Sequence, residues 1–539
     1  MKKSELWQNF LQGERPALRD FSYAGQKRAV PAGKRYEARD FGVAPDTDED
    51  MTGKIQFALD SIGKAGGGTL ALEPGRYLLG GSSPAERGVA LNYSNVTIAG
   101  AGSGCDGTVF YAEGHTLREG EPWLTKGLFH TGRNLLCDRF LSPKMLGQPI
   151  PILCDAAQGA RGVCVPAEEA KRLPPGECVI LCMYDSPAGD LARELIWPLE
   201  PDEAWSDLLT ANERGSAPYQ WLAEVSRTEG GEVWFDRPIL REIRARYRPC
   251  LYRVPMLEDI ALCDIRIESA WDGGGYYHHK NPEVDYGWNG VVFHRVRNGC
   301  IRNVWLHQFT QGIQLRDCKN VTVREITISG QDGHYGVKCY AHTTDCLVDG
   351  VDIYPAFTHG LGVEGTVQGN VFRKVRFHSA ATEIDLHGGG LPAFNLFEEV
   401  EGIAKISGGG AVFNLPYCGQ GNVYWNCSFS PCPPKGRLST YLEREGISGG
   451  VRQKRLTEVF HAWYWSYQKQ LDSYCDHKMY PQSIVRGLRG PGTIDQTPAA
   501  RREDAVWVEN VSGEDEIPSL YSAQCRRRKN MKERGAEKK

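Results

Sequence analysis

The sequence lacks the features that would place a protein in a membrane or direct it out of the cell. It has no apolar run of about eighteen residues, the length that a membrane-spanning helix needs. The N-terminal segment, in which Lys2 and Lys3 precede Ser4 and Glu5, has no apolar stretch typical of a secretory signal peptide. The formal net charge of -4 gives no general attraction to nucleic acid or to an anionic membrane. We therefore expect a cytoplasmic protein without nucleic-acid or membrane partners.

Paired metal-ligand motifs are also missing. The 17 cysteines are scattered, and no cluster of His and Cys has the spacing of a zinc site. Cys178 and Cys182 are too far apart for a CxxC motif, while Cys263, Cys339 and Cys427 fall in strand-like positions. A free cysteine in such a position behaves as a small buried hydrophobe. We favour that interpretation over a disulfide framework, in keeping with a reducing compartment.

The sequence does contain a repeat between residues 291 and 429. Alternating apolar and polar runs recur about every 22 to 28 residues, and they open at Gly290, Gly312, Gly336, Gly360, Glu383 and Ala411. A second alternating run comes next in most copies, often after an asparagine. Because a short repeat of this kind can bury its apolar face only against its neighbours, the pattern indicates a solenoid. The sequence predicts an all-β protein, a right-handed parallel β-helix.

The repeat divides the chain into six parts. Ile55, Leu59 and Ile62 form one apolar face, which predicts a helix over about residues 51–65 that caps the open end of the solenoid. The predicted parts are an N-terminal arm at 1–35, the helix cap and first rungs at 36–145, an inserted, partly β region at 146–254, the main rungs at 255–430, a mixed C-terminal region at 431–525, and a basic, frayed tail at 526–539.

The most specific motifs come after residue 36. An Asp-Phe-Gly at 40–42 precedes an acidic cluster, an Ile-Gln-x-Ala-Leu-Asp helix, a Gly-Gly-Gly-Thr-Leu at 66–70 and a Pro-Gly-x-Tyr at 74–77. This order resembles the N-terminal cap of the pectin- and pectate-lyase-like right-handed β-helix superfamily, over about residues 36–110 and 255–430. The resemblance implies the β-helix fold and an activity on polysaccharides, because its members are lyases, polygalacturonase-type hydrolases and phage tailspikes. The C-terminal part resembles an uncharacterised bacterial region that implies no chemistry.

Alignment of the rungs predicts which side chains face outward. The first and third residues after each opening are apolar, so the second and fourth face away from the core and form columns about 4.8 Å apart per rung. One column is Val292, Gln314, Lys338, Gly362 and Asp385, and the other is His294, Arg316, Tyr340, Glu364 and His387. His334, Tyr335 and His359 lie along the same edge. This concentration of His, Tyr, carboxylate and basic side chains is unlike a merely solvated face.

We predict an active site on this face, covered by a long loop at residues 271–289. The predicted catalytic residues are Lys338, His334, His359, Tyr340, Glu364, Asp385 and His387, and the predicted substrate-binding residues are Arg316, Gln314, His294, His278 and His279. The asparagines at 298, 320, 370, 395 and 422 are assigned to structure, since stacked amides at a bend can bond one another and the turn backbone.

The chemistry that these side chains suit best is β-elimination on a uronate. A cation neutralises the substrate carboxylate, a base removes the neighbouring proton and an acid protonates the leaving oxygen. Lys338, His334 or His359 would be the base. The substrate carboxylate would bind Arg316, whose planar guanidinium can donate two parallel hydrogen bonds.

The remaining members of the cluster would assist. Tyr340 or His387 would donate the proton, and Glu364 and Asp385 would orient these groups or bind a cation. We expect no obligatory cofactor, although Ca²⁺ stays open. The expected partner is an oligo- or polysaccharide, and homo-oligomerisation stays open.

Two alternatives remain. Glu364 and Asp385 could be the paired carboxylates of a glycoside hydrolase. Polygalacturonase-type hydrolases carry an Asp-Asp doublet and a Gly-His-Gly, whereas this sequence has only the partial matches Thr-His-Gly at 358–360 and Leu-His-Gly at 386–388. The other alternative is a carbohydrate-binding or tailspike-like protein without catalysis, because a fold alone does not assign a function.

Overall fold

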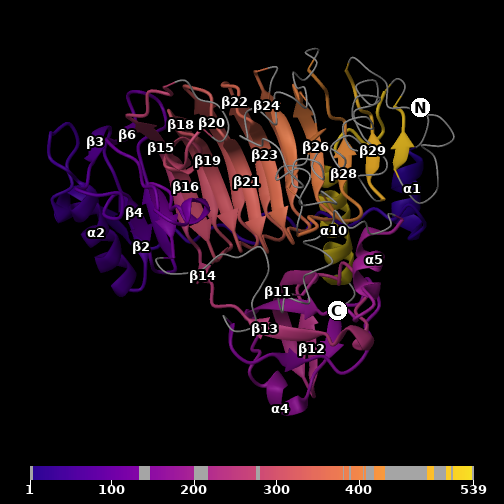
Figure 1. The fold of residues 1–539 in the computed structure, drawn as a ribbon. Coiled ribbons are helices and arrows are strands. Elements are labelled where there is room, and N and C mark those ends of the chain that lie inside the picture. The colour runs from indigo at the N-terminus through magenta and orange to yellow at the C-terminus, as the bar shows by residue number, and fades with distance from the viewer. Residues whose placement is uncertain are drawn as a thin grey trace, which may run out of the picture.

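The computed structural model describes residues 4–132, 146–198, 217–274, 280–379, 382–387, 390–404, 406–407, 418–430, 482–490, 506–511 and 514–536. Over this part of the chain the predicted right-handed parallel β-helix is confirmed, with successive strands stacked side by side along its axis (Figure 1). The predicted repeat opening at Ala411 lies outside the described residues.

Two long parallel sheets form the walls of the β-helix. The large sheet runs through β1 (Arg35–Glu37), β2 (Gly68–Ala71), β5 (Val96–Ala99), β15 (Ala261–Ser269), β18 (Cys300–His307), β20 (Thr322–Ser329), β22 (Leu347–Ile353), β24 (Val371–Phe377), β26 (Leu396–Glu401), β28 (Val423–Trp425), β29 (Ile484–Arg486) and β30 (Trp507–Glu509), with β3 (Gly75–Leu79) and β6 (Thr108–Ala112) beside its early strands. The second sheet runs through β4 (Val89–Leu91), β7 (Phe129–Thr131), β16 (Asn289–His294), β19 (Gln311–Arg316), β21 (Tyr335–Ala341), β23 (His359–Gly365), β25 (Glu383–His387) and β27 (Ile406–Ser407). Between them, β14 (Leu257–Glu258), β17 (Val296–Arg297) and a ladder of single bridges form a narrow third side.

Single residues in the left-handed backbone region turn the chain at the corners. One such residue stands two positions before each main strand of the large sheet, and the set is Asp259, Asn298, Asn320, Asp345, Gly369, Phe394 and Gly421. Asn, Asp and Gly tolerate a positive φ better than other residues, which explains their recurrence at this position.

The core is built by stacking like residues on neighbouring rungs. The rings of Phe372, Phe397 and Tyr424 stack with centroids 5.1 and 5.3 Å apart. The Asn370 amide nitrogen donates to the amide oxygen of Asn395 at 3.0 Å, and the amide of Asn395 donates to Asn422 at 3.2 Å. These three asparagines form part of the predicted structural ladder, whereas Asn298 donates to Asp259 and Asn320 donates to the N-terminal arm. Among the described residues, no two cysteines are joined by a disulfide.

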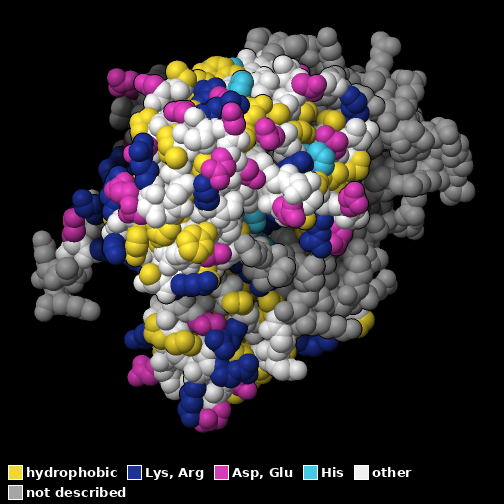
Figure 2. All heavy atoms as spheres, turned by 90° about the vertical axis from the view of Figure 1, so that its left-hand side faces the viewer, with side chains coloured by type: hydrophobic (Ala, Val, Ile, Leu, Met, Phe, Trp, Pro, Cys, Tyr) yellow, Lys and Arg dark blue, Asp and Glu magenta, His cyan; other side chains and the backbone are white. Residues whose placement is uncertain are grey.

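A helix closes the first end of the solenoid, as predicted. This helix, α2 (Thr52–Lys64), buries Ile55, Leu59 and Ile62 against the first rungs. Preceding it is a 3₁₀ turn at Ala38–Phe41. Seen from this end, acidic and basic side chains are interspersed over the surface (Figure 2). Among the helices that the structure describes, none has both the length and the apolar character to span a membrane.

An antiparallel sheet projects from the side of the β-helix (Figure 1). Its strand order is β8 (Ile150–Pro151), β13 (Cys250–Arg253), β10 (Cys178–Met183), β11 (Tyr219–Glu229), β12 (Glu232–Phe235) and β9 (Gly162–Cys164). The short helices α4 (Ala167–Ala170) and α5 (Asp190–Ile196) and a 3₁₀ turn at Ala245–Tyr247 accompany it. We call this unit the inserted sheet.

The N-terminal arm runs back along the turns of the β-helix. It starts with α1 (Glu5–Gln12) beside the last rungs, where the backbone N–H of Leu6 donates to Glu509 at 2.9 Å. Farther along, the side chain of Asn320 donates to the carbonyl oxygen of Tyr23 at 2.8 Å, and the backbone N–H of Lys27 donates to Asn298 at 2.9 Å. The arm thus spans the turns of many rungs.

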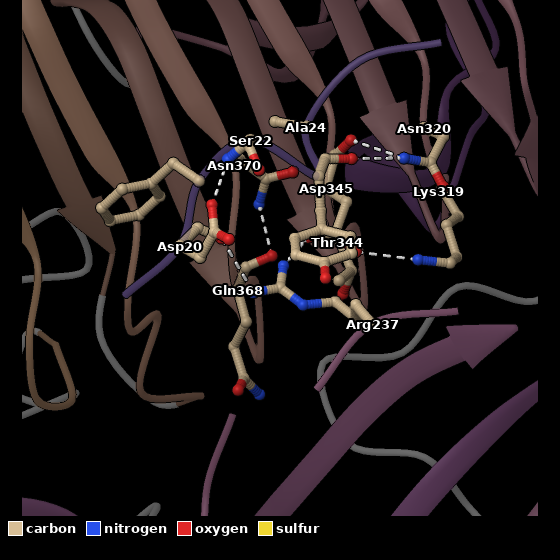
Figure 3. A network of polar contacts seen from close by, with 12 residues as sticks. Asp20, Ser22, Ala24, Arg237, Lys319, Asn320, Thr344, Asp345, Gln368 and Asn370 are labelled. Carbon is tan, nitrogen blue, oxygen red and sulfur yellow. Dashed lines mark hydrogen bonds and ion pairs between the residues drawn. The ribbon is translucent and has the colours of Figure 1, made fainter. Parts of the chain in front are cut away.

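Buried ion pairs join the β-helix, the arm and the inserted sheet. Arg237 of the inserted sheet pairs with Asp345, and Lys319 of the β-helix lies 2.8 Å from Asp345 and 3.3 Å from Asp236. Figure 3 shows Arg237 and Lys319 beside Asp345, with the arm passing close by. From the arm, Lys27 reaches Asp236 at 2.9 Å. Three segments far apart in the sequence therefore share one charge network.

The C-terminal tail differs from the prediction. Residues that we expected to be frayed continue a helix, α10 (Leu520–Ala536). The arm supplies the reason: the guanidinium of Arg528 stacks 3.6 Å from the ring of Tyr23 and donates to the carbonyl oxygen of Ser22 at 2.9 Å. Leu520 and Ala523 add apolar contacts to the same surface.

Candidate active site

The predicted site residues stand on neighbouring strands of the second sheet. The register pairs Gln314, Lys338, Gly362 and Asp385 across β19, β21, β23 and β25. It also pairs Arg316, Tyr340, Glu364 and His387. The two columns therefore have the membership expected from the alternation, with Val292 and His294 extending them on β16.

A third column accompanies the two that the alternation predicts. It consists of Gln311, Tyr335, His359 and Glu383, which are register partners at the start of the same strands. A glycine comes directly after the first three of them and breaks the alternation. At Gly336, a Cβ would lie 2.5 Å from the carbonyl oxygen of Gly360, so only glycine fits.

The columns point away from the core, but the expectation that they face solvent is wrong for most members. Asp385 is fully buried and Glu364 is 4% exposed, while Lys338 and His387 remain partly exposed. The physical reason is that loops pack over the sheet.

One covering loop contains the 3₁₀ turn Pro122–Leu124. Leu124 packs on Tyr340. The Nη2 of Arg316 donates to the carbonyl oxygens of Trp123 and Thr125 at 3.1 and 3.3 Å. Arg316 also donates to Gln314 through Nε and Nη2. Its guanidinium is thus held rigidly at the edge of the site.

The second covering segment is α7 (Pro282–Tyr286). The His334 ring lies 5.5 Å from the Tyr286 ring, and its Nδ1 is 3.3 Å from the carbonyl oxygen of Asp285. His278 and His279, predicted in the preceding part of this loop, lie outside the described residues.

Tyr335 occupies the centre of the cluster. Its hydroxyl donates to Asp385, two strands away, and lies 3.5 Å from Nδ1 of His387. The ring crosses the intervening rung at Gly362, where an added Cβ would lie 2.6 Å from it. The Lys338 ammonium is 4.1 Å from the ring centroid. Gly362 therefore provides the slot that lets a tyrosine join the two columns.

The neighbouring side chains and burial determine the protonation states of Tyr335 and Asp385. Burial raises the pKa of the Tyr335 phenol well above its usual value, and the Asp385 and Glu364 carboxylates raise it further. Burial opposes ionisation of Asp385, but the charges of His359 and His387 and the bonds from His387 and Tyr335 hold the pKa of its carboxyl well below the usual range. At neutral pH, Tyr335 is therefore a proton donor beside a charged Asp385.

Glu364 connects the two partly exposed side chains. It forms an ion pair with Lys338, and its other oxygen lies 3.8 Å from Nε2 of His387. The Nδ1 of His387 is 3.2 Å from Asp385. A carboxylate that holds one imidazole nitrogen orients the other for proton transfer. Lys338 and His387 are thus presented side by side at the surface.

Two further histidines lie beneath this surface. The rings of His334 and His359 are 5.5 Å apart, and both contact Tyr335, at 4.5 and 4.6 Å. Burial lowers the pKa of His359, although Asp385 and Glu383 oppose the shift. The ring of His359 packs against the Tyr335 ring.

A groove of about 630 Å³ opens beside the cluster, over β7, β16 and β19. Its lining includes His130, His294, Arg316 and Lys126. These side chains make the groove basic next to the columns of the second sheet, which suits an acidic ligand.

His294 belongs to a buried relay that the sequence did not reveal. Its Nε2 lies 3.0 Å from Asp317, whose other oxygen is 2.5 Å from Nδ1 of His342. The Nε2 of His342 is 2.6 Å from the side-chain oxygen of Gln220 in the inserted sheet. Burial opposes ionisation of Asp317, but the two imidazoles hold the pKa of its carboxyl well below the usual range. The rungs gave little signal, because Asp317 directly follows β19 and His342 directly follows β21, but the two lie one position apart in the register that pairs Arg316 with Tyr340.

Within the part of the chain that the structure describes, no three His, Cys, Asp or Glu side chains come together as a metal site would require. The candidate site brings together acid–base and electrostatic groups: a donor phenol, a carboxylate-held imidazole and two cations.

Comparison with known proteins agrees with the fold. Residues 270–411 match the family model described as a right handed beta helix region. The tailspike protein gp49 from Pseudomonas phage LKA1 superposes with a TM-score of 0.50 over 85% of this chain and 71% of that chain, at 13% identity. The resemblance to the right-handed β-helix superfamily is confirmed by these matches.

Short sequence matches extend to enzymes. A stretch of 69 residues, 13% of this chain, is 45% identical to Alginate lyase 7 of Azotobacter vinelandii. A stretch of the same length is 42% identical to the Mannuronan C5-epimerase AlgE1 of the same organism. These stretches span only 8% and 5% of those two proteins.

Proposed function

We propose that this β-helix protein is a carbohydrate-active enzyme that cleaves an acidic, uronate-containing poly- or oligosaccharide by β-elimination. The observation that carries the proposal is the cluster of Tyr335, Lys338, Glu364, Asp385 and His387 on one sheet face. It combines the base, the proton donor and the cation that elimination next to a carboxylate needs.

The geometry supports a division of roles. His387, held by Asp385 and partly exposed, is the base that removes the proton next to the substrate carboxylate. Tyr335 protonates the leaving oxygen, since its phenol stays protonated at neutral pH. Lys338 forms an ion pair with Glu364, which suits it to neutralise the substrate carboxylate rather than to act as the base.

The basic groove beside the cluster extends the proposal to substrate binding. Arg316 and His294 both line it. In the described hydrogen bonds, Arg316 uses Nε and Nη2, and Nη1 makes none of them. We therefore assign Arg316 to a substrate carboxylate in the unit next to the one that is cleaved.

The cluster is poorly suited to hydrolysis by paired carboxylates. That reaction needs one protonated carboxyl group as the general acid. The imidazoles and the phenol around Asp385 hold the pKa of its carboxyl well below the usual range, so it is charged at neutral pH. Glu364 is tied to Lys338. Neither carboxylate is placed as a ready proton donor.

C5-epimerisation of a uronate is the second candidate. The matched relatives carry the names of an alginate lyase and of mannuronan C5-epimerases. Both reactions begin by removal of the proton beside the carboxylate, and they differ in the next step: loss of the leaving oxygen, or return of a proton to the opposite face. The same base and cation would serve either.

One incubation series separates these functions. Poly- and oligouronates of several kinds, short ones included, are mixed with the enzyme, and the ultraviolet absorbance of unsaturated chain ends is monitored. Appearance of that absorbance supports elimination. Incorporation of solvent deuterium at C5 without chain cleavage would establish epimerisation instead, and new reducing ends without absorbance would establish hydrolysis. Binding with no chemical change across the series would leave a tailspike-like carbohydrate-binding protein.

A further inference from the structure

Two cysteines of the inserted sheet face each other across neighbouring strands. Cys182 on β10 and Cys250 on β13 are register partners in an antiparallel pair, and both side chains lie in one apolar cluster with Leu222 and Tyr252. Antiparallel partners have Cα atoms about 4.5–5.5 Å apart, within the span of about 4.4–6.8 Å that a disulfide bridges. A disulfide could therefore join the two with little movement of the backbone.

Hydrogen bonds distinguish the two thiols. Cys250 is bonded by the Cys182 thiol and by the hydroxyls of Tyr252 and Tyr184, and these bonds lower its pKa although burial opposes the change. The two hydroxyls are themselves 2.9 Å apart. Burial and the bond with Cys250 raise the pKa of Cys182 well above its usual value. Cys250 is therefore the member of the pair that loses its proton first.

Exposure makes the same distinction. Cys250 is 6% exposed, whereas Cys182 has no exposed surface. Tyr184 and Met256, which pack against the cluster, are only partly buried, so the cluster reaches the surface of the inserted sheet. Because the thiolate is the reactive form of cysteine, Cys250 is the thiol that meets a reagent from solvent. The small exposed area favours a reagent of a few atoms over a bulky one.

Cys178 provides a contrast on the same strand. Its side chain lies in the same cluster and is 2% exposed. Its neighbours across the sheet are Glu224 and Val254 rather than a cysteine. Burial raises the pKa of its thiol to about 12. Cys178 is thus a buried thiol of the ordinary, unreactive kind, in the surroundings that Cys182 and Cys250 share.

We propose that Cys250 and Cys182 form a peroxide-reactive dithiol, in which a small hydroperoxide oxidises Cys250 and Cys182 then closes a disulfide. In the first step the Cys250 sulfur attacks the hydroperoxide. An S–O bond forms, the O–O bond breaks, and the leaving oxygen takes the proton that the Cys250 thiol released. The pair lies outside the acid–base cluster, so the inference does not depend on the reaction of that cluster.

The second step joins the two strands. The Cys182 sulfur attacks the sulfenic acid of Cys250, an S–S bond forms, and the hydroxyl group leaves as water with the proton of Cys182. Over both steps two thiols are oxidised to one disulfide, and the hydroperoxide is reduced to an alcohol and water.

Oxidation of the full, reduced chain with hydrogen peroxide at neutral pH tests the proposal. Quantitative alkylation measures the loss of each thiol, and peptide mapping without reduction locates disulfides. We expect a disulfide between Cys182 and Cys250. The Cys250 thiol should be lost about tenfold or more faster than the Cys178 thiol in the same sample, since only the thiolate reacts. This comparison lies within the unchanged chain, so it holds even where a variant fails to fold.

Substitutions separate the two roles. Cys182→Ala should stop at a sulfenic acid on Cys250, which dimedone traps, and Cys250→Ala should leave the Cys182 thiol unreacted. Tyr252→Phe should slow the loss of the Cys250 thiol by about threefold or more, because it removes one of the bonds to that sulfur. Cys178→Ala is the matched control and should leave the disulfide yield unchanged. Since no Lys or Arg separates Cys178 from Cys182, it also assigns the cross-link in tryptic peptides.

Several results would overturn the proposal. Equal rates of loss for the Cys178 and Cys250 thiols would mean that burial alone sets their reactivity. A chain that forms no cross-link between Cys182 and Cys250 would exclude the second step, and sulfenic acid on Cys182 in Cys250→Ala would exclude the order of attack. Oxidised glutathione, a bulky disulfide, should cross-link the pair more slowly than hydrogen peroxide does. Faster cross-linking by oxidised glutathione would exclude a hydroperoxide as the oxidant.

Discussion

The hydroxyl of Tyr335 donates to Asp385 across a full rung of the β-helix, over the bare backbone of Gly362. Tyr335 on β21 is thereby joined to Asp385 and His387 on β25, and the three side chains form a single acid–base group. The arrangement requires that the intervening residue, Gly362, has no side chain. Gly362 is therefore part of the site.

The first prediction concerns that slot. Gly362→Ala should lower kcat by about tenfold or more, because a methyl group 2.6 Å from the Tyr335 ring must displace it. Gly362 is not one of the residues with a positive φ, so alanine introduces no backbone strain. Steady-state kinetics with an oligouronate gives the measurement. Gly53→Ala, whose Cβ would meet open space on α2, is the control. Unchanged kcat in Gly362→Ala would mean that Tyr335 is not in the reaction.

A second prediction concerns Glu364. Glu364→Gln keeps the shape of the side chain and removes the charge that holds Lys338 and faces His387. We expect kcat to fall by about 10² or more, the effect of disturbing a general acid–base group. Some stability should also be lost, since the change leaves the partly buried Lys338 ammonium without its partner. The control is Glu401→Gln, which removes a surface pair with Arg376. Wild-type kcat in Glu364→Gln would move the chemistry elsewhere on the sheet.

The third prediction tests the buried relay. Asp317 raises the pKa of His294 against the lowering effect of burial, so Asp317→Asn should lower that pKa further. Histidine NMR titration of the free protein measures this directly. With an oligouronate, KM should rise more than kcat falls, because His294 lines the binding groove rather than the acid–base cluster. Asp332→Asn, at an exposed turn, should change neither quantity. An unaltered His294 titration would show that Asp317 has no influence on the groove.

Low pH should weaken the ion pairs that join the β-helix to the inserted sheet and so lower the free energy of unfolding. Burial opposes the ionisation of Asp236, but Lys319 and Lys27 lower its pKa to about 2 from a usual 3.8. Because the folded-state pKa is depressed, the stabilisation is complete above about pH 4 and is lost as the pH falls toward 2. Urea denaturation across this range should show the loss.

The contribution of these ion pairs to stability can also be tested by mutation. Lys319→Met should cost about 3–5 kcal/mol at neutral pH, since it leaves Asp236 and Asp345 buried without this cation. Arg35→Gln breaks an exposed pair with Glu37 and should change the stability little. Equal effects of the two changes would contradict a buried network that carries stability.

The sequence was sufficient for the fold and for two columns of the site. Val337 and Leu361 face the core. Because side chains alternate between the two faces of a strand, Lys338 and Glu364 must point away from the core. Tyr335 was placed along the edge of the site but was given no role there, because Gly336 interrupts the alternation and counting back from Val337 places the tyrosine inside.

Burial of the site could be predicted only in part, since the loop at residues 271–289, which contains Tyr286, was expected to cover it and the loop around Leu124 was not. It depends on where the loops around Leu124 and Tyr286 come to rest, and loop placement has no period in the sequence. The relay through Asp317 depends on Gln220, which approaches from the inserted sheet, far away in the chain. Contacts of this kind between remote segments leave no local pattern.

The N-terminal arm has a consequence for the order of events during synthesis. Leu6 bonds to Glu509, so this part of the arm can dock only after Glu509, far later in the sequence, has been synthesised. Leu6, Leu18 and Phe21 cover an apolar stripe that includes Val371 and Leu396. Rungs can assemble on their neighbours as they emerge, whereas this stripe stays uncovered until the arm docks. The rungs that carry Val371 and Leu396 must therefore be protected from aggregation between their own assembly and the docking of the arm.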